Sequence, residues 1–506
     1  MRLGPSAALV ALFFVAACGG AQTPASTTPS PSVPEAAPTP VAPEAAASDD
    51  TVGRAPNSVE RSAVQRLIDE TVATRHLEPT RPITIRVARA QQIATRLAGQ
   101  IEPEDVEHAR AEYTALGLLP PQLDLRTLLK DLLAEQVVGF YDPERDDLVI
   151  RDDAARGLTR IGLSPEPLEG RAALAHEIVH ALQDQRLGLG EAMHLDRDTD
   201  AEDALHSLVE GDATLAMVGW LLARAGQPLQ DLTQDPGRMR GLRQMAAPSG
   251  ERLLAAPRIV QVSLLAPYLE GLNFCAVLHA RGGFAAIDAA HAHPPRSMEQ
   301  VLHPQKYLAG EEPETIALPP LPSLEAAGFH PLLDDTLGEL EMGVYLGLGQ
   351  ESGVDEAAAA GWGGDRLRIY QGPRELAAVW LSTWDDEDEA RGAEQAARRA
   401  QGTSSVEEQD SERVLRIGRA LMILRGVPAE QQAGVVAAQA EDWPAAEARF
   451  REVIAEDPER DDARYNLGVS LMNQGKNREA RRELSRIHDD SEVARDASRL
   501  RLQLSP

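Results

Sequence analysis

Apolar residues recur at helical spacing over long stretches of the chain beyond residue 57. This spacing predicts packing helices over 59–75, 86–98, 102–116, Leu125–Gln136, Arg171–Gln185 and Asp200–Ala223. Asp124 lies where an N-cap residue would accept hydrogen bonds from the free N–H groups of the helix that follows it. The periodicity therefore indicates a mainly helical fold.

Short apolar runs interrupt this pattern in two places and predict β-strands. The runs 137–141 and 148–150 flank a turn rich in Asp and Pro, which is typical of a β-hairpin. Further strands are predicted at 367–370, 377–381, 414–417 and 420–424, around a charged helix over 385–401. The acidic start of that helix suits the positive end of the helix dipole. We expect an α+β fold class, mainly helical, with a small α+β subdomain over 331–427.

A 34-residue period follows Pro428. Residues 34 positions apart match in the pairs Trp443 and Asn477, Ala446 and Ala480, Gly434 and Gly468, and Phe450 and Leu484. This period resembles tetratricopeptide (TPR) repeats. We expect one and a half to two TPR-like repeats over 428–506, which is fewer than the three needed for independent stability. They form either a surface that binds a partner protein or a helical cap on the preceding domain.

The first 18 residues are typical of a bacterial export signal, with Arg2 before the apolar core Ala7–Ala17. The signal ends in Val-Ala-Ala-Cys, which resembles a lipoprotein lipobox and implies lipidation of Cys18 as the membrane anchor. An ordinary signal peptide is the alternative. Gly19 in place of Asp favours the outer membrane, facing the periplasm or the cell surface. Residues 19–57 predict a disordered Pro/Ala/Ser/Thr tether, and we expect no later run able to span a bilayer.

Charge and cysteine content narrow the function. A formal charge of −29 argues against binding nucleic acid, whose phosphates such a protein would repel. The two cysteines, Cys18 and Cys275, are too few for a disulfide framework. Cys275 lies in an apolar helix over 272–280 and is expected to be a buried core residue.

The predicted helix 171–185 carries the strongest chemical motif, His176-Glu177-Ile178-Val179-His180. Residues four apart share one helix face, so the two imidazoles can bind the same Zn²⁺ ion. Glu177 lies beside the first ligand, where its carboxylate can act as general base toward a metal-bound water. The alternative is a helix with two ordinary surface histidines.

A catalytic zinc takes three protein ligands and leaves one position open. Glu202, His206 and Glu210 lie four apart on one face of the helix 200–223, and each is a candidate third ligand. Below we choose Glu210, and His206 is the main alternative because imidazole is also a common zinc ligand. Asp184 or Asp212 is expected to orient a ligand histidine from outside the metal's own ligand set.

The stretch 208–213, Leu-Val-Glu-Gly-Asp-Ala, resembles the glutamate-bearing helix of gluzincin peptidases, and on this resemblance we choose Glu210. Gly211 would let the two helices approach closely. Thr214 departs from the pattern of thermolysin relatives, which have an acidic residue four places after the ligand glutamate.

Five segments together resemble an uncharacterised bacterial and archaeal family of predicted zinc metallopeptidases. They are the motif-bearing segment 171–185, the Val-Glu-Gly-Asp-Ala segment 209–213, and the segments 266–307, 337–339 (Leu-Gly-Glu) and 359–366. The resemblance covers about 120–425. It implies a zincin-like metallopeptidase domain over 58–330, completed by 331–427, with one zinc ion bound by His176, His180 and Glu210. In thermolysin-type enzymes an edge strand beside the active-site helix pairs with extended substrate, so the hairpin is either such a strand or a structural hairpin with a covered edge.

Peptide hydrolysis also needs a donor that stabilises the oxyanion of the tetrahedral intermediate. Tyr268, His303, Tyr307 and Arg296 are candidates, and the alternative is that they only fix loops. We expect a membrane-tethered zinc endopeptidase that acts on a peptide or protein substrate. The alternatives are a partner-binding TPR scaffold lipoprotein with a structural metal site, and a cell-wall amidase that uses the same centre. A propeptide within 58–120 also remains open.

Overall fold

The structure is a computed structural model. It describes residues 52–136, 138–159, 165–192, 197–245, 251–318, 321, 324–325, 327–373, 375–401, 413–427, 443–456, 458, 460–488 and 494–504. The expected signal peptide with Cys18, and the tether up to residue 51, lie outside these residues. The main chain of Arg54 pairs with that of Val87, with N–H···O distances of 2.9 and 2.8 Å. Ordered contacts therefore begin inside the range 19–57 that we expected to be a tether.

The N-terminal part is built of helices around one short strand: α2 (Ser58–Arg75), β1 (Thr84–Ala88), α3 (Ala90–Gln100), α4 (Pro103–Ala115) and α5 (Leu125–Gln136). The predicted N-cap of α5 is confirmed, because Asp124 Oδ1 accepts from Thr127 N at 3.0 Å. The predicted helix 86–98 is partly wrong, because residues 84–88 form a strand that pairs parallel with a distant strand, 147–151. The polar Arg86 between the apolar Ile85 and Val87 gives the alternation of polar and apolar residues that is typical of a strand.

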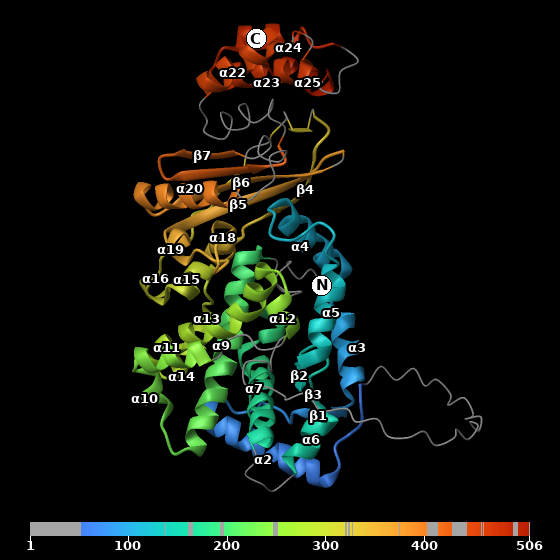
Figure 1. Ribbon diagram of the computed structural model, residues 1–506, viewed down its shortest axis with the longest axis vertical. Coiled ribbons are helices and arrows are strands. Elements are labelled where there is room, and N and C mark those ends of the chain that lie inside the picture. The colour runs from blue at the N-terminus through green and yellow to red at the C-terminus, as the bar shows by residue number, and fades with distance from the viewer. Residues whose placement is uncertain are drawn as a thin grey trace, which may run out of the picture.

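A three-stranded sheet covers the motif helix α7 (Pro165–Leu187). Its order is β1-β3-β2, where β2 (Gly139–Asp142) and β3 (Asp147–Arg151) form the predicted antiparallel hairpin. All four residues of β2 are buried, although β2 is an edge strand. The helix α6 (Asp152–Leu158) follows β3, and a one-turn helix α8 (Leu189–Ala192) follows α7. Figure 1 shows α7 beside this small sheet.

The second motif helix α9 (Thr199–Arg224) crosses α13 (Arg258–Gly282) at a pair of glycines. A Cβ added to Gly211 would lie 2.1 Å from the main-chain oxygen of Gly271, and one added to Gly271 would lie 2.0 Å from that of Ser207. The expected close approach at Gly211 therefore exists, but α9 makes it with α13 and not with α7. The smaller helices of this part are α10 (Leu229–Thr233), α11 (Pro236–Met245), α12 (Glu251–Ala255), α14 (Phe284–Ala292), α15 (Met298–Leu302) and α16 (Pro304–Ala309).

α13 is long and apolar enough to cross a membrane by length and composition, contrary to our expectation that no later run is. It packs inside the fold, with 72% of its most apolar window buried. Cys275 lies in this helix and is fully buried, as expected.

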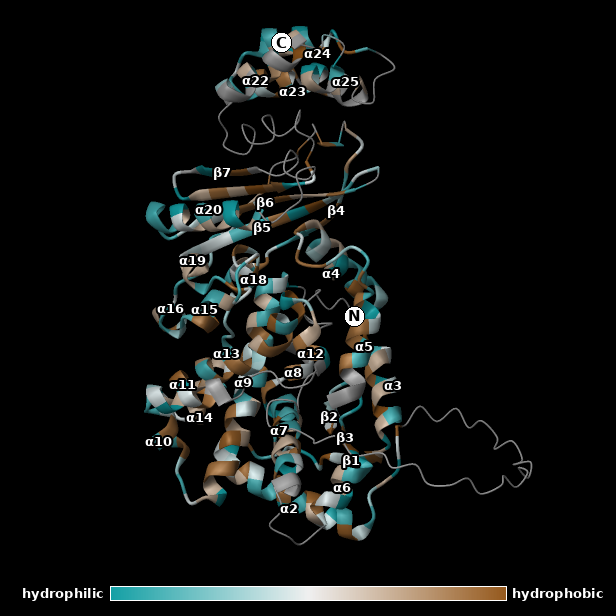
Figure 2. Cartoon of the chain, viewed as in Figure 1, coloured by the Kyte–Doolittle hydropathy of each residue, from teal (hydrophilic) through white to brown (hydrophobic). Residues whose placement is uncertain are grey.

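The expected α+β subdomain is a five-stranded antiparallel sheet with the order β4-β5-β6-β8-β7. Its elements are β4 (His330–Asp335), α18 (Gly338–Leu346), α19 (Glu356–Ala359), β5 (Trp362–Gln371), β6 (Leu376–Trp384), α20 (Glu387–Gln401), β7 (Arg413–Ile417) and β8 (Ala420–Arg425). The alanines of α20 are buried and its charged residues face outward. Figure 2 shows the hydrophobic colouring along β6 and the more hydrophilic colouring of α20.

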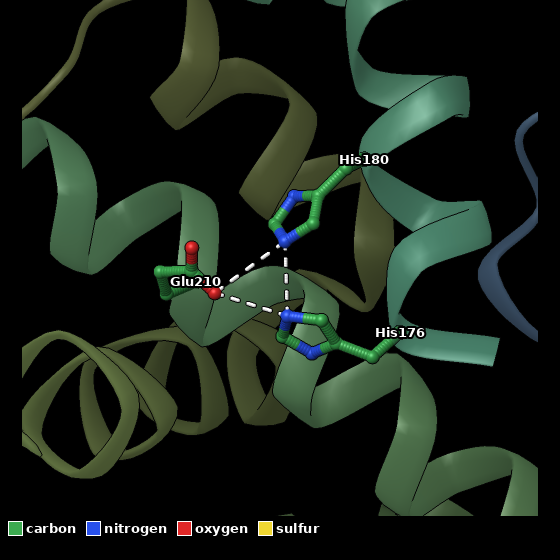
Figure 3. A group of neighbouring side chains, drawn as sticks. All are labelled: His176, His180 and Glu210. Atoms are coloured by element: carbon green, nitrogen blue, oxygen red, sulfur yellow. Dashed lines mark hydrogen bonds and ion pairs between the residues drawn. The ribbon is translucent and has the colours of Figure 1, made fainter. Parts of the chain in front are cut away.

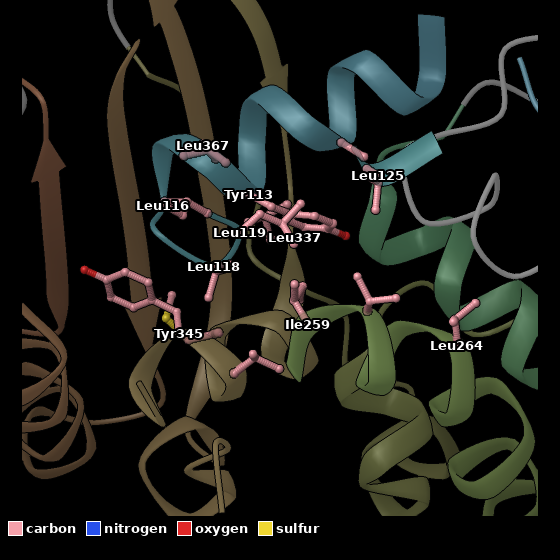
Figure 4. Packing of buried hydrophobic residues seen from close by; sticks show 14 of the residues in the cluster. Tyr113, Leu116, Leu118, Leu119, Leu125, Ile259, Leu264, Leu337, Tyr345 and Leu367 are labelled. Carbon is pink, nitrogen blue, oxygen red and sulfur yellow. The ribbon is translucent and has the colours of Figure 1, made fainter. Parts of the chain in front are cut away.

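One hydrophobic core joins this sheet to the helical part. Residues of α4 and the loop after it pack with residues of α13, α18 and β5, including Tyr113, Leu116, Leu119, Ile259, Leu337 and Leu367 (Figure 4). The hydroxyl of Tyr113 also donates to Glu341 Oε1 at 2.6 Å. The ranges 58–330 and 331–427 thus share a hydrophobic core.

Among the described residues, the repeat region contains four helices: α22 (Trp443–Glu456), α23 (Asp461–Asn473), α24 (Asn477–Leu484) and α25 (Ala494–Gln503). α22 and α24 begin 34 residues apart, which is the predicted period. Phe450, Leu467, Leu471 and Ala480 form a buried cluster among these helices.

Candidate metal centre

Three side chains from α7 and α9 converge on one point (Figure 3). His176 Nε2 lies 2.9 Å from His180 Nε2 and 3.0 Å from Glu210 Oε2, and His180 Nε2 lies 3.4 Å from the same oxygen. His176 is fully buried, while the side chains of His180 and Glu210 are 12% and 14% exposed. Two imidazole nitrogens and a carboxylate oxygen therefore form a compact triangle.

This triangle fits the donor set of a metal ion. Tetrahedral bonds of about 2.0–2.1 Å would separate neighbouring ligand atoms by roughly 3.3 Å, close to the observed separations. Among the described residues, His176, His180 and Glu210 form one metal-ligating group, and His206 is not part of it. The geometry therefore favours Glu210 over His206 as the third ligand.

The electrostatics of the triangle favour a cation. Burial lowers the pKa of His176 to about 4. Burial opposes ionisation of Glu210, but the His180 charge and hydrogen bonds outweigh it and lower the pKa of Glu210 to about 2. Burial also opposes the charged form of His180, but the carboxylate of Glu210 outweighs it and raises the pKa of His180 to about 9. The carboxylate thus holds its negative charge and draws a positive charge to this point.

Glu177 lies one residue after the first histidine and is held by the edge strand. The main-chain N–H of Tyr141 donates to Glu177 Oε2 at 3.1 Å. Burial raises the pKa of Glu177 to about 7, although the charge of His180 acts in the opposite direction. The outward N–H at this point of β2 is therefore covered by Glu177, and pairing of β2 with a substrate stays a prediction.

The phenol of Tyr141 attaches β2 to α7 a second time. Its hydroxyl donates to Asp184 Oδ2 at 2.7 Å and lies 2.9 Å from Asp146 Oδ1, and Arg81 Nε donates to Asp146 Oδ2 at 2.6 Å. Asp184 is one of the two residues predicted to orient a ligand histidine, and of the two it is the one that holds the edge strand.

Asp212 does lie behind a ligand histidine, through a residue that the sequence analysis did not single out. Gln183 Oε1 lies 2.8 Å from His180 Nδ1, and Gln183 Nε2 donates to Asp212 Oδ2 at 2.9 Å. The available signal was its position three residues after His180, which puts both side chains on neighbouring turns of one face.

Of the candidate oxyanion donors, Tyr268 lies next to the triangle. Its ring centroid is 6.2 Å from that of His176. His303 is paired with Glu339, with Nε2 and Oε1 2.8 Å apart, and Tyr307 donates to the carbonyl of His293 at 2.8 Å.

Arg296, which precedes α15, forms an exposed ion pair with Glu312 at 3.2 Å. In the described part of the chain, neither it nor His303 nor Tyr307 contacts the triangle by a hydrogen bond or ion pair. The contacts of His303, Tyr307 and Arg296 therefore agree with the alternative that these residues only fix loops.

A second acidic group, Glu299, Glu311 and Asp385, also has metal-ligand spacing. The ammonium of Lys306 lies among its oxygens at 2.6, 2.9 and 2.7 Å. This lysine satisfies the three carboxylates, so the group needs no metal ion.

Comparison with known families matches the C-terminal third of the chain. Residues 330–443 match a family described as Domain of unknown function (DUF8575), and residues 437–503 match one described as Tetratricopeptide repeat. No curated protein and no solved structure matches the chain. The chain therefore has a TPR-like region at its C-terminus, as the 34-residue period predicted. The residues of the metal centre precede both matched ranges.

Proposed function

We propose that this protein is a zinc-dependent endopeptidase with a zincin-like catalytic domain of the gluzincin type. The observation that carries the proposal is the convergence of His176 Nε2, His180 Nε2 and Glu210 Oε2 beside the carboxylate of Glu177. Three protein ligands leave a coordination position open, whereas a structural zinc is expected to have four. Zinc bound by these residues would supply a water of lowered pKa, about 7, and polarisation of a substrate carbonyl.

Glu177 is suited to move a proton. A general base works best when its pKa lies near the working pH, and burial raises the pKa of Glu177 to about 7. Its carboxylate is oriented by the N–H of Tyr141 at 3.1 Å. Glu177 can therefore accept a proton from the attacking water and return it to the leaving amine.

Tyr268 is the residue that we propose as oxyanion donor. Its ring lies 6.2 Å from that of His176 and is nearly buried, so it is the candidate donor whose side chain adjoins the triangle. A hydrogen bond to developing negative charge is worth most in such a water-poor site.

The edge strand β2 supports an extended peptide as substrate. Arg151 N donates to the carbonyl of Val138 at 2.9 Å, so the polar main-chain groups of Gly139 and Tyr141 point away from β3. The N–H of Tyr141 then reaches Glu177. A peptide that pairs with this outer side of β2 would pass the general base, and to bond to the N–H of Tyr141 it would have to replace Glu177 there.

The test uses the full chain loaded with Zn²⁺, incubated with a diverse peptide library and read by mass spectrometry. Glu177→Gln should bind one zinc and lose cleavage, and Glu210→Gln should lose zinc. If the wild type and Glu177→Gln both bind zinc and neither cleaves peptides, the peptidase proposal fails. Parallel incubation with cell-wall fragments detects the amidase alternative, which would use the same residues.

We also propose that the protein is exported and anchored to the outer membrane through lipidated Cys18, and that the TPR-like region binds a partner protein. The lipobox-like end of the signal and the family match to residues 437–503 support these points. Metabolic labelling with a fatty acid should mark the wild type and not Cys18→Ser. Labelling of both would contradict the anchor.

A further inference from the structure

His180 is held in one tautomer by Gln183. The amide Nε2 of Gln183 donates to the carbonyl of Val209 at 3.0 Å and to Asp212 Oδ2 at 2.9 Å. Both partners can only accept, so the amide oxygen must face His180, 2.8 Å from Nδ1. His180 Nδ1 therefore carries a proton that it donates, and the lone pair of Nε2 is directed at the triangle when the ring is neutral.

Asp212 is in turn fixed by Arg75, which lies 137 positions earlier in the chain, at the end of α2. Arg75 Nε donates to Asp212 Oδ1 at 2.6 Å, and Arg75 Nη2 donates to Oδ2 at 3.0 Å. His291 Nε2 donates to the same Oδ2 at 3.1 Å. With the amide of Gln183, Asp212 accepts four hydrogen bonds, so its carboxylate has little freedom to turn.

Arg75 is itself locked in place. Its side chain and that of Asp212 are fully buried. Arg75 Nη2 also donates to Asp288 Oδ1 at 2.5 Å, and the guanidinium lies 4.6 Å from the ring centre of Phe284. A bidentate guanidinium in such a site fixes both the position and the plane of its carboxylate partner.

We propose that Arg75 is a positioning residue of the metal centre, acting through Asp212 and Gln183 on His180. This inference rests on the proposed metal site. It makes α2 a permanent part of the centre, because without Arg75 the carboxylate of Asp212 would be buried with its main cationic partner missing. A propeptide that included α2 could not be removed without loosening His180.

The experiment measures Zn²⁺ affinity of the full chain by competition with a chromophoric chelator, and the visible absorption of the Co²⁺-loaded protein. Gln183→Met keeps the length of the side chain and buries no charge, yet removes the bond to His180. It should weaken zinc binding about 10- to 100-fold and shift the cobalt bands. Arg75→Met should do the same, and Arg75→Lys should recover part of the affinity, since it keeps the charge but not the bidentate contact.

Lys306→Met is the matched control. It removes a largely buried cation from the acidic group Glu299, Glu311 and Asp385, and none of these three residues belongs to the proposed metal site. It should lower stability and leave zinc affinity and the cobalt spectrum unchanged. If Arg75→Met does not fold, Gln183→Met and Arg75→Lys decide. Wild-type zinc affinity in Gln183→Met and Arg75→Lys, with unchanged cobalt bands, would overturn the inference. If the wild type binds no zinc, the proposed function fails instead.

Discussion

Gly211 and Gly271 face each other where α9 crosses α13, and neither position has room for a methyl group. A Cβ on Gly211 would lie 2.1 Å from the carbonyl oxygen of Gly271. Glu210 lies next to this contact on one helix, and Tyr268 lies one turn before it on the other. The crossing therefore determines how the proposed oxyanion donor sits relative to the proposed ligand.

Gly211→Ala should destabilise the protein and impair the centre. The added methyl must push two main chains apart, and overpacking of this kind costs about 1–3 kcal/mol and occasionally more. We expect a lower midpoint of denaturant unfolding together with a loss of cleavage. Gly392→Ala is the control, since Gly392 lies inside α20 with nothing within 4 Å of an added Cβ. This control variant should gain about 0.5–1 kcal/mol of stability. Equal effects of the two changes would contradict the close contact of α9 with α13 at Gly211.

Tyr141→Phe should weaken catalysis without weakening zinc binding. The change removes the hydroxyl contacts to Asp184 and Asp146, which are worth about 1–3 kcal/mol together with their charged partners. β2 then holds Glu177 less firmly, while no ligand atom is touched. Peptide cleavage and chelator competition measure the two effects separately.

Tyr113→Phe is the matched control for that change. Its buried hydroxyl donates to Glu341 at 2.6 Å in the core shared with the five-stranded sheet. We expect a comparable loss of stability with cleavage intact. If both tyrosine variants lose cleavage equally, the effect reflects general destabilisation and not the attachment of β2.

Much of the candidate centre could be predicted because its signals are local. His176 and His180 share a face through the geometry of one helix, and Glu210 is one of three candidates spaced four apart. Spacing alone could not choose among the three. The choice of Glu210 came from a resemblance, and the structure places its carboxylate, not His206, in the triangle.

Features that depend on distant pairing could not be predicted. Residues 84–88 form a strand because β3 lies beside them, and a local helical period cannot reveal that partner. The contact of Arg75 with Asp212 spans 137 positions and has no local pattern. Gly211 did signal a close approach, but a glycine does not identify which helix approaches it.

Removal of the metal should lower stability in a ligand-dependent way. A metal that binds the folded state stabilises it by about 4 kcal/mol at 1,000 times its dissociation constant. A chelator should therefore lower the thermal midpoint of the zinc-loaded wild type. It should have little effect on Glu210→Gln, which lacks the carboxylate ligand of the proposed site. Zinc added back should restore the wild type alone. A chelator effect of the same size in both proteins would place the bound metal elsewhere.

Asp365 should make stability fall as pH rises from about 4 to 6. It is buried at the start of β5 and accepts hydrogen bonds from the main-chain N–H groups of Leu337 and Gly338 and from the indole of Trp362. Burial nevertheless raises its pKa from 3.8 to about 6, so the folded state binds a proton that the unfolded chain has released.

Asp365 contributes its full stabilisation below its pKa in the unfolded chain, and this stabilisation is lost as pH rises through its pKa in the folded protein. Asp365→Asn stays neutral and does not lose this contribution, so its stability relative to the wild type should increase between pH 4 and pH 7. The expected change is on the order of 3 kcal/mol. Denaturant unfolding of both proteins at the two pH values measures it. A relative stability that moves the other way would mean that the three donors outweigh burial and hold the carboxylate ionised.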